Sequence, residues 1–432
     1  MVLDEIVKAQ KRGEAKGITS ICSAHPWVLK AAMQKGTPRD SESLRVLLIE
    51  STCNQVNQFG GYTSMTPKDF VAYVRGIAEE NSFPFENVIL GGDHLGPNVW
   101  QNEPADSAMQ KSAVLMKDYV QAGFVKIHLD CSMRLGDDPQ GALDVGVSAK
   151  RAAQLAKVAE DTFSLSQRER GRSEGAPRYV IGTEVPVPGG AHEHEEGVSV
   201  TKGKDARQTI EVTREAFYRE GLQSAWERVT GVVVQPGVEF GDDFVLEYQP
   251  GKAKELSRFI EDQSMIYEAH STDYQTCDAL RNLVRDHFAI LKVGPGLTFA
   301  FREAVFALAM MENELFPADE RSNIISVLDD VMIHHPEHWK KYYRGNESEQ
   351  AFKRKYSLSD RVRYYWPNPQ IQSALEKLLH HLEQKPTPFS LLNQFTPLQY
   401  KRIRRGEIEN APKSILLGYV QEVLSEYQAA QS

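Results

Sequence analysis

An aspartate and a histidine stand side by side at the end of a short apolar run. Residues 87–90 are followed by two glycines, then by Asp93 and His94, and then by a Gly-Pro loop. Such a run is typical of a parallel strand buried on both faces, and the carboxyl ends of such strands are where α/β folds keep their chemistry. The pair therefore offers a base and a metal ligand. The alternative is an aspartate that bonds loop amides beside a packed histidine.

Eight short apolar segments of this kind predict buried strands. They are residues 18–22, 46–50, 88–92, 125–130, 179–184, 232–235, 265–268 and 289–293. Most neighbouring pairs are separated by a stretch with helical periodicity. Eight strand-helix units within about 300 residues favour a TIM (β/α)8 barrel, because each parallel crossover needs its own helix. A doubly wound sheet is the second choice.

The domain organisation follows from where the strand signal ends. We expect the barrel over residues 1–315 and a helical C-terminal extension, packed on the barrel, over residues 316–432. Thr66-Pro67 followed by Asp69 predicts a helix start, and Gly123 a helix end. Residues 164–178, rich in Arg, Glu, Gly and Ser, are expected to form an exposed insertion before the fifth strand.

In a barrel, the polar residues that follow the strands meet on one face. His94, Glu184 and His270 form the best candidate set for a divalent metal, because imidazole and carboxylate groups suit zinc, manganese or cobalt. Such an ion would polarise a sugar carbonyl, and Asp93 would take a proton from a hydroxyl or an α-carbon. Asp130 is a second candidate catalytic carboxylate, on the same strand face as His128.

Candidate substrate-binding residues come from the same strand ends. An amide-rich loop after the second strand suits a polyhydroxylated ligand such as a sugar, since each amide offers a donor and an acceptor. A loop that bonds only to itself is the alternative reading. Gly294-Pro295-Gly296 opens a helix whose free amides suit a phosphate. The candidate substrate-binding residues are Asn54, Gln55, Asn57, Gln58, Gln235, Asp273, Lys292 and Gly294.

Composition excludes several other classes of function. The net charge is −9 and no block rich in Lys or Arg occurs, which argues against nucleic acid as a partner. No apolar run is long enough to cross a membrane, and the first residues lack the plan of a signal peptide, so we expect a cytoplasmic protein. The four cysteines are scattered and suggest neither disulfides nor a cysteine metal site.

Several longer motifs carry a resemblance to a known family. These are residues 21–26, 54–62, 91–98, 126–130, 181–190, 235–240, 267–275, 291–294 and 356–366. Together they resemble the GatZ/KbaZ family, the Z-type subunits of D-tagatose-1,6-bisphosphate aldolase, over nearly the whole chain. The resemblance implies a class II aldolase-like barrel in galactitol or amino-sugar catabolism. It also implies a partner, the catalytic Y-type subunit, which needs the Z-type subunit for full activity and stability.

The resemblance also bears on the site residues. Asp93 and His94 match the base and zinc ligand of Y-type class II aldolases, and His270 resembles a later ligand. The chain departs from those enzymes at two points: Glu184 stands where they have a histidine, and residues 271–274 lack the glycines of their phosphate loop. Zinc is therefore the expected ion, with manganese and cobalt as alternatives.

Two functions are compatible with this sequence. The first is an accessory Z-type subunit that binds and stabilises a Y-type aldolase. The second is a metal-dependent ketose or ketose-phosphate aldolase or epimerase in its own right, with Asp93 as the base. Family members have also been labelled tagatose-6-phosphate kinases, but the sequence has no Walker-type or kinase glycine loop. A homo-oligomer is compatible with either function.

Overall fold

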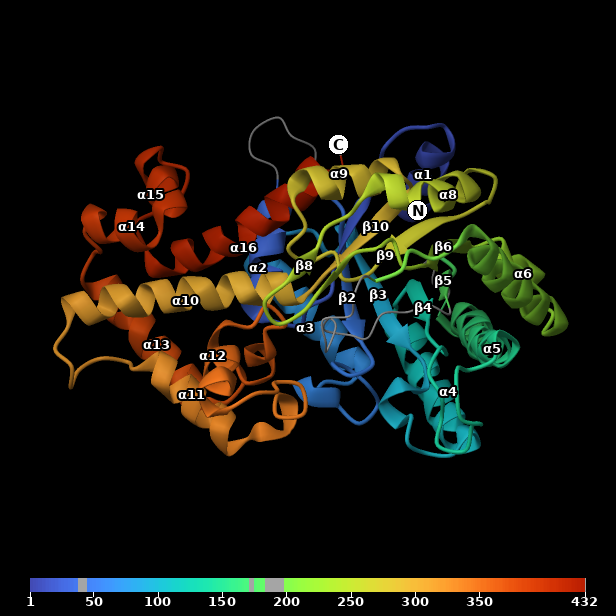
Figure 1. Cartoon of the computed structure of the whole chain (residues 1–432), viewed down its shortest axis with the longest axis horizontal. Helices are drawn as coiled ribbons and strands as arrows, with labels where there is room; N and C mark the ends of the chain where they lie inside the picture. Colours follow the sequence, from blue (N-terminus) through green and yellow to red (C-terminus); the bar gives the residue numbers. More distant parts are fainter. Residues whose placement is uncertain (38–44, 171–174, 183–197, 432) are drawn as a thin grey trace.

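Eight parallel strands close into a barrel in the order β1-β10-β9-β6-β5-β4-β3-β2 (Figure 1). The structure is a computed structural model and describes residues 1–37, 45–170, 175–182 and 198–431. The barrel strands are β1 (Ile18–Ile21), β2 (Leu47–Thr52), β3 (Val88–Leu95), β4 (Lys126–Leu129), β5 (Arg178–Gly182), β6 (Val229–Val233), β9 (Ile266–Ala269) and β10 (Phe288–Val293). Two short strands, β7 (Glu239–Phe240) and β8 (Val245–Leu246), pair separately. The predicted TIM barrel is confirmed, with all eight strands near their predicted positions.

Ten helices precede or surround the strands in the described part of the chain. They are α1 (Val2–Lys11), α2 (Pro26–Gly36), α3 (Pro67–Glu80), α4 (Ala105–Ala122), α5 (Val145–Arg170), α6 (Gly203–Arg219), α7 (Gln223–Trp226), α8 (Pro250–Glu261), α9 (Cys277–Arg285) and α10 (Pro295–Leu315). Short 3-10 turns occupy Gly61–Thr63, Phe85–Asn87, Pro97–Trp100, Pro336–His338 and Arg361–Tyr364. None of the described helices is long and apolar enough to cross a membrane.

The predicted helix signals are present, with one correction. Thr66 and Asp69 exchange side chain to backbone hydrogen bonds at the start of α3, and Gly123 adopts a left-handed conformation at the end of α4. The predicted insertion at 164–178 was wrong in its first half, because α5 continues to Arg170. Leu, Gln, Arg and Glu in this stretch are good helix formers, and their propensity prolongs the helix.

The C-terminal helices gather on one side of the barrel, next to α10 and α2 (Figure 1). They are α11 (Ile324–His334), α12 (Glu347–Tyr356), α13 (Pro369–Gln384), α14 (Phe389–Phe395), α15 (Pro397–Arg404) and α16 (Pro412–Ala429). Helix α16 packs against α2, α9, α10 and β1. Its Tyr427 hydroxyl donates a hydrogen bond to the carbonyl oxygen of Thr272, at 2.8 Å. The last helix therefore supports the loop that follows β9.

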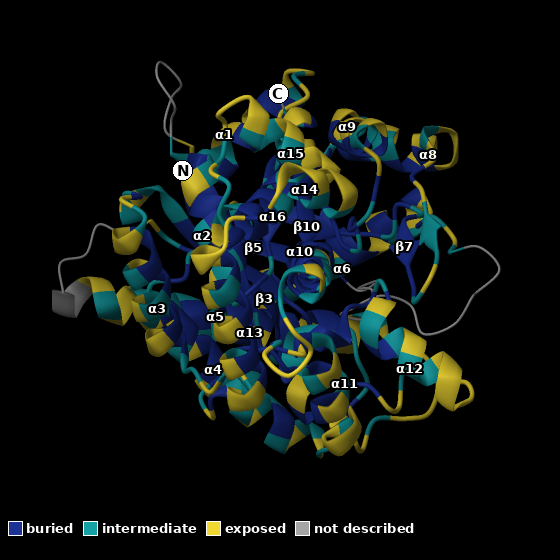
Figure 2. Ribbon diagram, turned by 90° about the vertical axis from the view of Figure 1, so that its left-hand side faces the viewer, coloured by how far each residue is buried: buried dark blue, intermediate teal, exposed yellow. Residues whose placement is uncertain are grey.

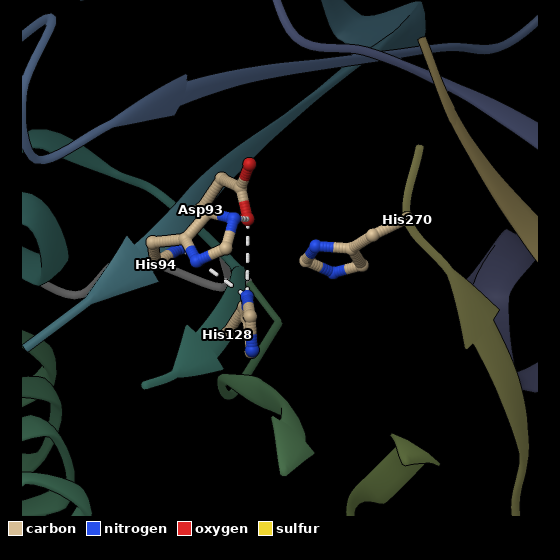
Figure 3. A group of neighbouring side chains, drawn as sticks. All are labelled: Asp93, His94, His128 and His270. Carbon is tan, nitrogen blue, oxygen red and sulfur yellow. Dashed lines mark hydrogen bonds and ion pairs between the residues drawn. The ribbon is translucent and has the colours of Figure 1, made fainter. Parts of the chain in front are cut away.

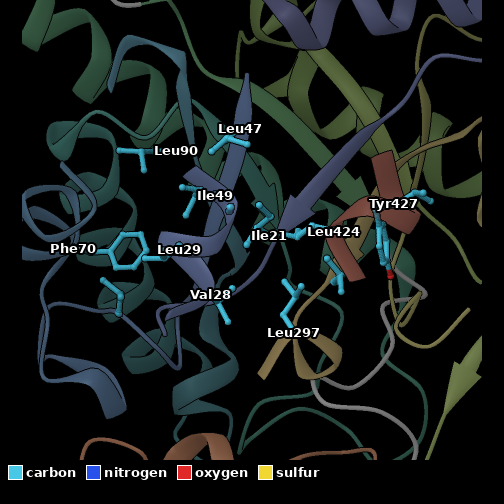
Figure 4. Close-up of a cluster of buried hydrophobic side chains, with 14 of the residues drawn as sticks. Ile21, Val28, Leu29, Leu47, Ile49, Phe70, Leu90, Leu297, Leu424 and Tyr427 are labelled. Atoms are coloured by element: carbon cyan, nitrogen blue, oxygen red, sulfur yellow. The ribbon is translucent and has the colours of Figure 1, made fainter. Parts of the chain in front are cut away.

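The space between the strands and their covering helices is apolar. Ile21 and Ile49 on the strands, Leu29 on α2 and Leu424 on α16 belong to one continuous buried cluster (Figure 4). Figure 2 shows the strands as the buried centre of the molecule, with exposed residues on the outer faces of the helices. Burial of the apolar strand and helix faces in this cluster stabilises the arrangement of strands that carries the site.

The interior of the barrel is layered. At its amino-terminal end, apolar strand residues form a second buried cluster, which Leu3 and Ile6 of α1 cover. Two residues further along four of these strands the inward side chains become polar, because side chains on one face of a strand recur every second residue. These are Ser20, Glu50, Glu268 and Lys292. The barrel thus changes from apolar to charged towards the end that carries the candidate site.

Candidate metal centre and adjoining cavity

Four potential metal ligands converge at the carboxyl end of the barrel. Asp93 and His94 end β3, His128 lies in β4 and His270 follows β9. Each offers one ligand atom, and these atoms all lie within 4.8 Å of one another. In Figure 3, His270 faces the other three from the opposite strand. None of the four is more than 5% exposed. Three strands distant in sequence therefore build one buried donor set.

The end of β3 departs from regular strand geometry at the pair itself. His94 has a left-handed backbone with φ of 47°, and the register between β3 and β4 shifts between Gly92 and Leu95. A side chain at Gly96 could not fit, since its Cβ would lie 1.9 Å from the carbonyl oxygen of Asp130. The glycine lets β3 approach the β4 loop closely and places His94 beside Asp130.

Asp130 orients His94 and does not line the cavity described below. Its Oδ2 lies 2.8 Å from Nδ1 of His94, and its Oδ1 accepts hydrogen bonds from the amide and the hydroxyl of Ser132. A carboxylate on one ring nitrogen fixes the ring and leaves the other nitrogen for a metal. Burial alone would lower the pKa of His94, but the carboxylates of Asp93 and Asp130 outweigh it and raise the pKa.

The other two imidazoles are held neutral. Burial lowers the pKa of His128, and burial together with the charge of Lys292 lowers the pKa of His270 to about 3. Nδ1 of His128 lies 3.0 Å from Oδ1 of Asp93 and 3.2 Å from the backbone nitrogen of His94, whereas its Nε2 points away from these two residues. Neutral imidazole is the form that binds metals. The donor set therefore fits a divalent ion such as zinc.

A buried charged layer lies directly beneath the donors. Nζ of Lys126 lies 2.7 Å from Oε1 of Glu50 and 2.5 Å from Oε2 of Glu268. Nζ of Lys292 lies 3.4 Å from Glu50 and 3.3 Å from Glu268, and it also contacts Oδ1 of Asp93. Glu268 in turn lies 3.0 Å from Nε2 of His270. The two lysines and two glutamates thus neutralise one another while holding Asp93 and His270.

A cavity of about 100 Å³ adjoins the donors. Asp93, His94 and His270 form one part of its wall, and Arg363 and Tyr364 of the C-terminal segment form another. A second cavity of about 420 Å³ shares Gln55, Gly294 and Arg363 with this inner cavity and is also lined by Tyr73 and Trp366. A small ligand would meet charged side chains beside the donors and aromatic side chains in the neighbouring cavity.

Five of the predicted substrate-binding residues line the inner cavity, namely Asn54, Gln55, Asp273, Lys292 and Gly294. Some of their polar atoms are already engaged. Oε1 of Gln55 accepts a hydrogen bond from the amide of Thr52. The amide of Gly294, predicted to be free for a phosphate, donates to Asp273. Asn54 and Gln55 are thus the part of the amide-rich loop that reaches the cavity.

The other predicted residues lie elsewhere. Asn57 bonds within its own loop, Gln58 donates to the carbonyl oxygen of Lys111, and Gln235 accepts from the amides of its own turn. None of these three lines the inner cavity. The self-bonded alternative therefore describes Asn57 well. Glu184, the third predicted metal ligand, lies outside the described residues.

Sequence reasoning missed two parts of the site. His128 was noted only as a strand-end residue, although its spacing from Asp130 puts it on the same strand face. Arg363 and Tyr364 come from a 3-10 turn far along the chain, and no local pattern links them to the barrel.

Comparison with known protein families shows to which family the chain belongs. The model of the family described as D-tagatose-1,6-bisphosphate aldolase subunit GatZ/KbaZ-like matches residues 3–432. The chain belongs to this family. The resemblance that the motifs carry is therefore confirmed over nearly the whole chain.

Named members of the GatZ/KbaZ-like family are similar along their whole length. The D-tagatose-1,6-bisphosphate aldolase subunits GatZ of Salmonella dublin and Klebsiella pneumoniae are each 51% identical over 426 residues, covering 99% of this chain and 98% of theirs. A solved structure from Sinorhizobium meliloti, titled a probable tagatose 6 phosphate kinase, is 46% identical with a TM-score of 0.86, covering 96% of this chain and 100% of that one.

Proposed function

We propose that this chain is the Z-type subunit of a D-tagatose-1,6-bisphosphate aldolase and supports the activity and stability of a Y-type subunit. The observation that carries the proposal is the 51% identity to subunits of that name over 99% of the chain. In this proposal the protein acts in sugar-phosphate catabolism in the cytoplasm. Its partners are the Y-type subunit and a ketose or ketose phosphate.

The proposed role includes a divalent metal centre, with His94, His128 and His270 as the described ligands and Asp93 beside them as the base. Zinc is the expected ion, and manganese or cobalt are alternatives. When bound, the ion would polarise a sugar carbonyl. The neutral state of His128 and His270 supports this assignment. Glu184 remains a predicted further ligand.

Residues of the chain would supply proton transfer, positioning of a metal ligand, and binding of the sugar hydroxyl groups. Burial alone would raise the pKa of Asp93, but His94, Lys292 and the hydrogen bond with His128 outweigh it and hold the pKa well below its usual range. Asp93 is thus an ionised acceptor for a proton from a ligand hydroxyl or carbon. Asp130 acts as a positioning residue for His94. Asn54 and Gln55 would bind hydroxyl groups at the cavity wall.

Co-expression with the Y-type subunit of the same organism tests the proposal. We expect a tag on the Y-type subunit to retain this chain, and aldolase activity to rise relative to the Y-type subunit alone. Binding at about 100 times the dissociation constant should stabilise the partner against unfolding by about 2–3 kcal/mol, which a urea titration measures. Absence of both a complex and stimulation would refute the proposal.

A second candidate function is a metal-dependent ketose or ketose-phosphate aldolase or epimerase in this chain alone. The cavity beside the ionised Asp93 favours it, because a purely structural subunit has no need of a site with room for a ligand. The purified chain should then convert a ketose or ketose phosphate, and Asp93→Asn should slow that reaction by about 10²–10⁴-fold. If D93N stimulates the Y-type subunit as wild type does and neither form acts alone, the role is accessory only.

A further inference from the structure

The loop after β9 carries Asp273, whose carboxylate binds the backbone amides at the amino-terminal end of α10. Oδ1 of Asp273 accepts hydrogen bonds from the backbone amides of Gly294, at 3.0 Å, and Gly296, at 2.7 Å. These amides open α10, a helix of 21 residues. Asp273 is 3% exposed and lines the inner cavity. A side chain of the protein itself therefore occupies the amides that were predicted to hold a phosphate.

The carboxylate of Asp273 already occupies the two amides and the space beside them. Free amides and the positive end of the helix dipole make a helix start attractive to one anionic group. Oδ1 of Asp273 would lie only 3.1 Å from a Cβ built on Gly296, so the carboxylate fills the space that this glycine leaves. A phosphate arriving there would have to displace Asp273 or meet its negative charge at close range.

The loop that carries Asp273 is held on both sides. Ser271 and Tyr274 have left-handed backbones, with φ of 52° and 64°, which turn the chain sharply around Asp273. The Thr272 hydroxyl donates to the carbonyl oxygen of Lys292, and the Tyr274 hydroxyl to that of Leu358. These bonds tie the loop to β10 and to the C-terminal segment. Asp273 is therefore fixed in place rather than free to swing away.

We propose that Asp273 is a built-in substitute for a substrate phosphate. The cavity would then take a sugar whose end facing α10 is a free hydroxyl and not a phosphate ester. The inference rests on the proposed function, because it concerns the ligand of the same cavity. It names the ligand as a polyhydroxylated ketose that is unphosphorylated at this end, and it makes Asp273 the residue that determines this specificity.

Binding of inorganic phosphate to the metal-loaded protein tests the proposal. Burial raises the pKa of Asp273 to about 6, so titration calorimetry at pH 8 keeps the carboxylate ionised. Asp273→Gly frees both amides and should bind phosphate about tenfold or more tightly than wild type. Asp273→Asn keeps the volume and an acceptor oxygen, removes only the charge, and should give a smaller gain.

Asp360→Asn is the matched control. Asp360 is also buried and accepts a hydrogen bond from the Thr298 hydroxyl of α10, but it does not contact the first amides. It should gain no phosphate affinity. The proposal fails if wild type binds phosphate as tightly as D273G, or if D273G and D273N keep their fold and metal but gain nothing. Co-purification with the Y-type subunit is scored separately, so failure of the proposed function is distinguishable from failure of this inference.

Discussion

Replacing Lys126 with methionine should lower the free energy of unfolding by about 3–5 kcal/mol, which is the typical cost of breaking a buried ion pair by removing one partner. Lys126 is fully buried and lies between Glu50 and Glu268. Methionine has a similar length and apolar stem, so the variant removes the charge with little change in packing. Three buried carboxylates, Glu50, Asp93 and Glu268, would then share the remaining lysine of this layer, Lys292.

Urea unfolding measures this effect, with Lys117→Met as the control. Lys117 is exposed on α4, and its replacement should change the unfolding free energy by less than about 0.5 kcal/mol. Adding Glu50→Gln to Lys126→Met should restore part of the loss, because it removes one of the unpaired charges. A double-mutant cycle with no coupling between the two positions would contradict the described network.

Protein purified without chelator should contain one equivalent of a divalent metal, and His270→Ala and His94→Ala should each lose it. Removing a second-shell partner typically weakens metal binding 10–100-fold, so loss of a direct ligand should cost more than about 100-fold. Elemental analysis and competition with a chromophoric chelator measure stoichiometry and affinity. His128→Ala should also weaken metal binding, because Nδ1 of His128 lies beside Asp93 and His94.

His380→Ala is the control for the metal experiment. His380 is exposed on α13, where it forms a hydrogen bond with Gln384, so its removal should leave metal content unchanged. Metal addition should also raise the thermal stability of wild type but not of H270A, since an ion that binds only the folded chain stabilises it. Wild-type protein that stays free of metal when zinc, manganese or cobalt is added would rule out the centre.

The fold was predictable because its pattern is local. Each barrel strand is a short apolar run, and turn residues such as Gly123 mark where the helices end. Asp93, His94 and His270 were predictable as a group for a related reason: they follow such runs, and a barrel brings all its strand ends to one face. Local sequence thus accounts for the barrel and for the grouping of Asp93, His94 and His270 at one end of it.

Other parts of the site depend on contacts that sequence spacing does not reveal. Lys292 was predicted to bind substrate, yet it also lies between Glu50, Glu268 and Asp93, because four strands bring their inward side chains together at one level. Asp273 was predicted to bind substrate, and the hydrogen bond that its carboxylate accepts from the amide of Gly296 depends on the turn around Asp273. Pairings of this kind are set by tertiary packing and not by residue type.

The charged layer also bears on how the chain completes its fold during synthesis. Glu50 emerges early, while Lys292 belongs to β10, which must pair with β1 to close the barrel. Until that strand has been made, the carboxylates inside a partial barrel lack some of their partners and favour staying in water. Contacts between segments so distant in sequence form slowly. The buried carboxylates therefore oppose collapse of a partial barrel. They become fully enclosed once β10 has been made and pairs with β1.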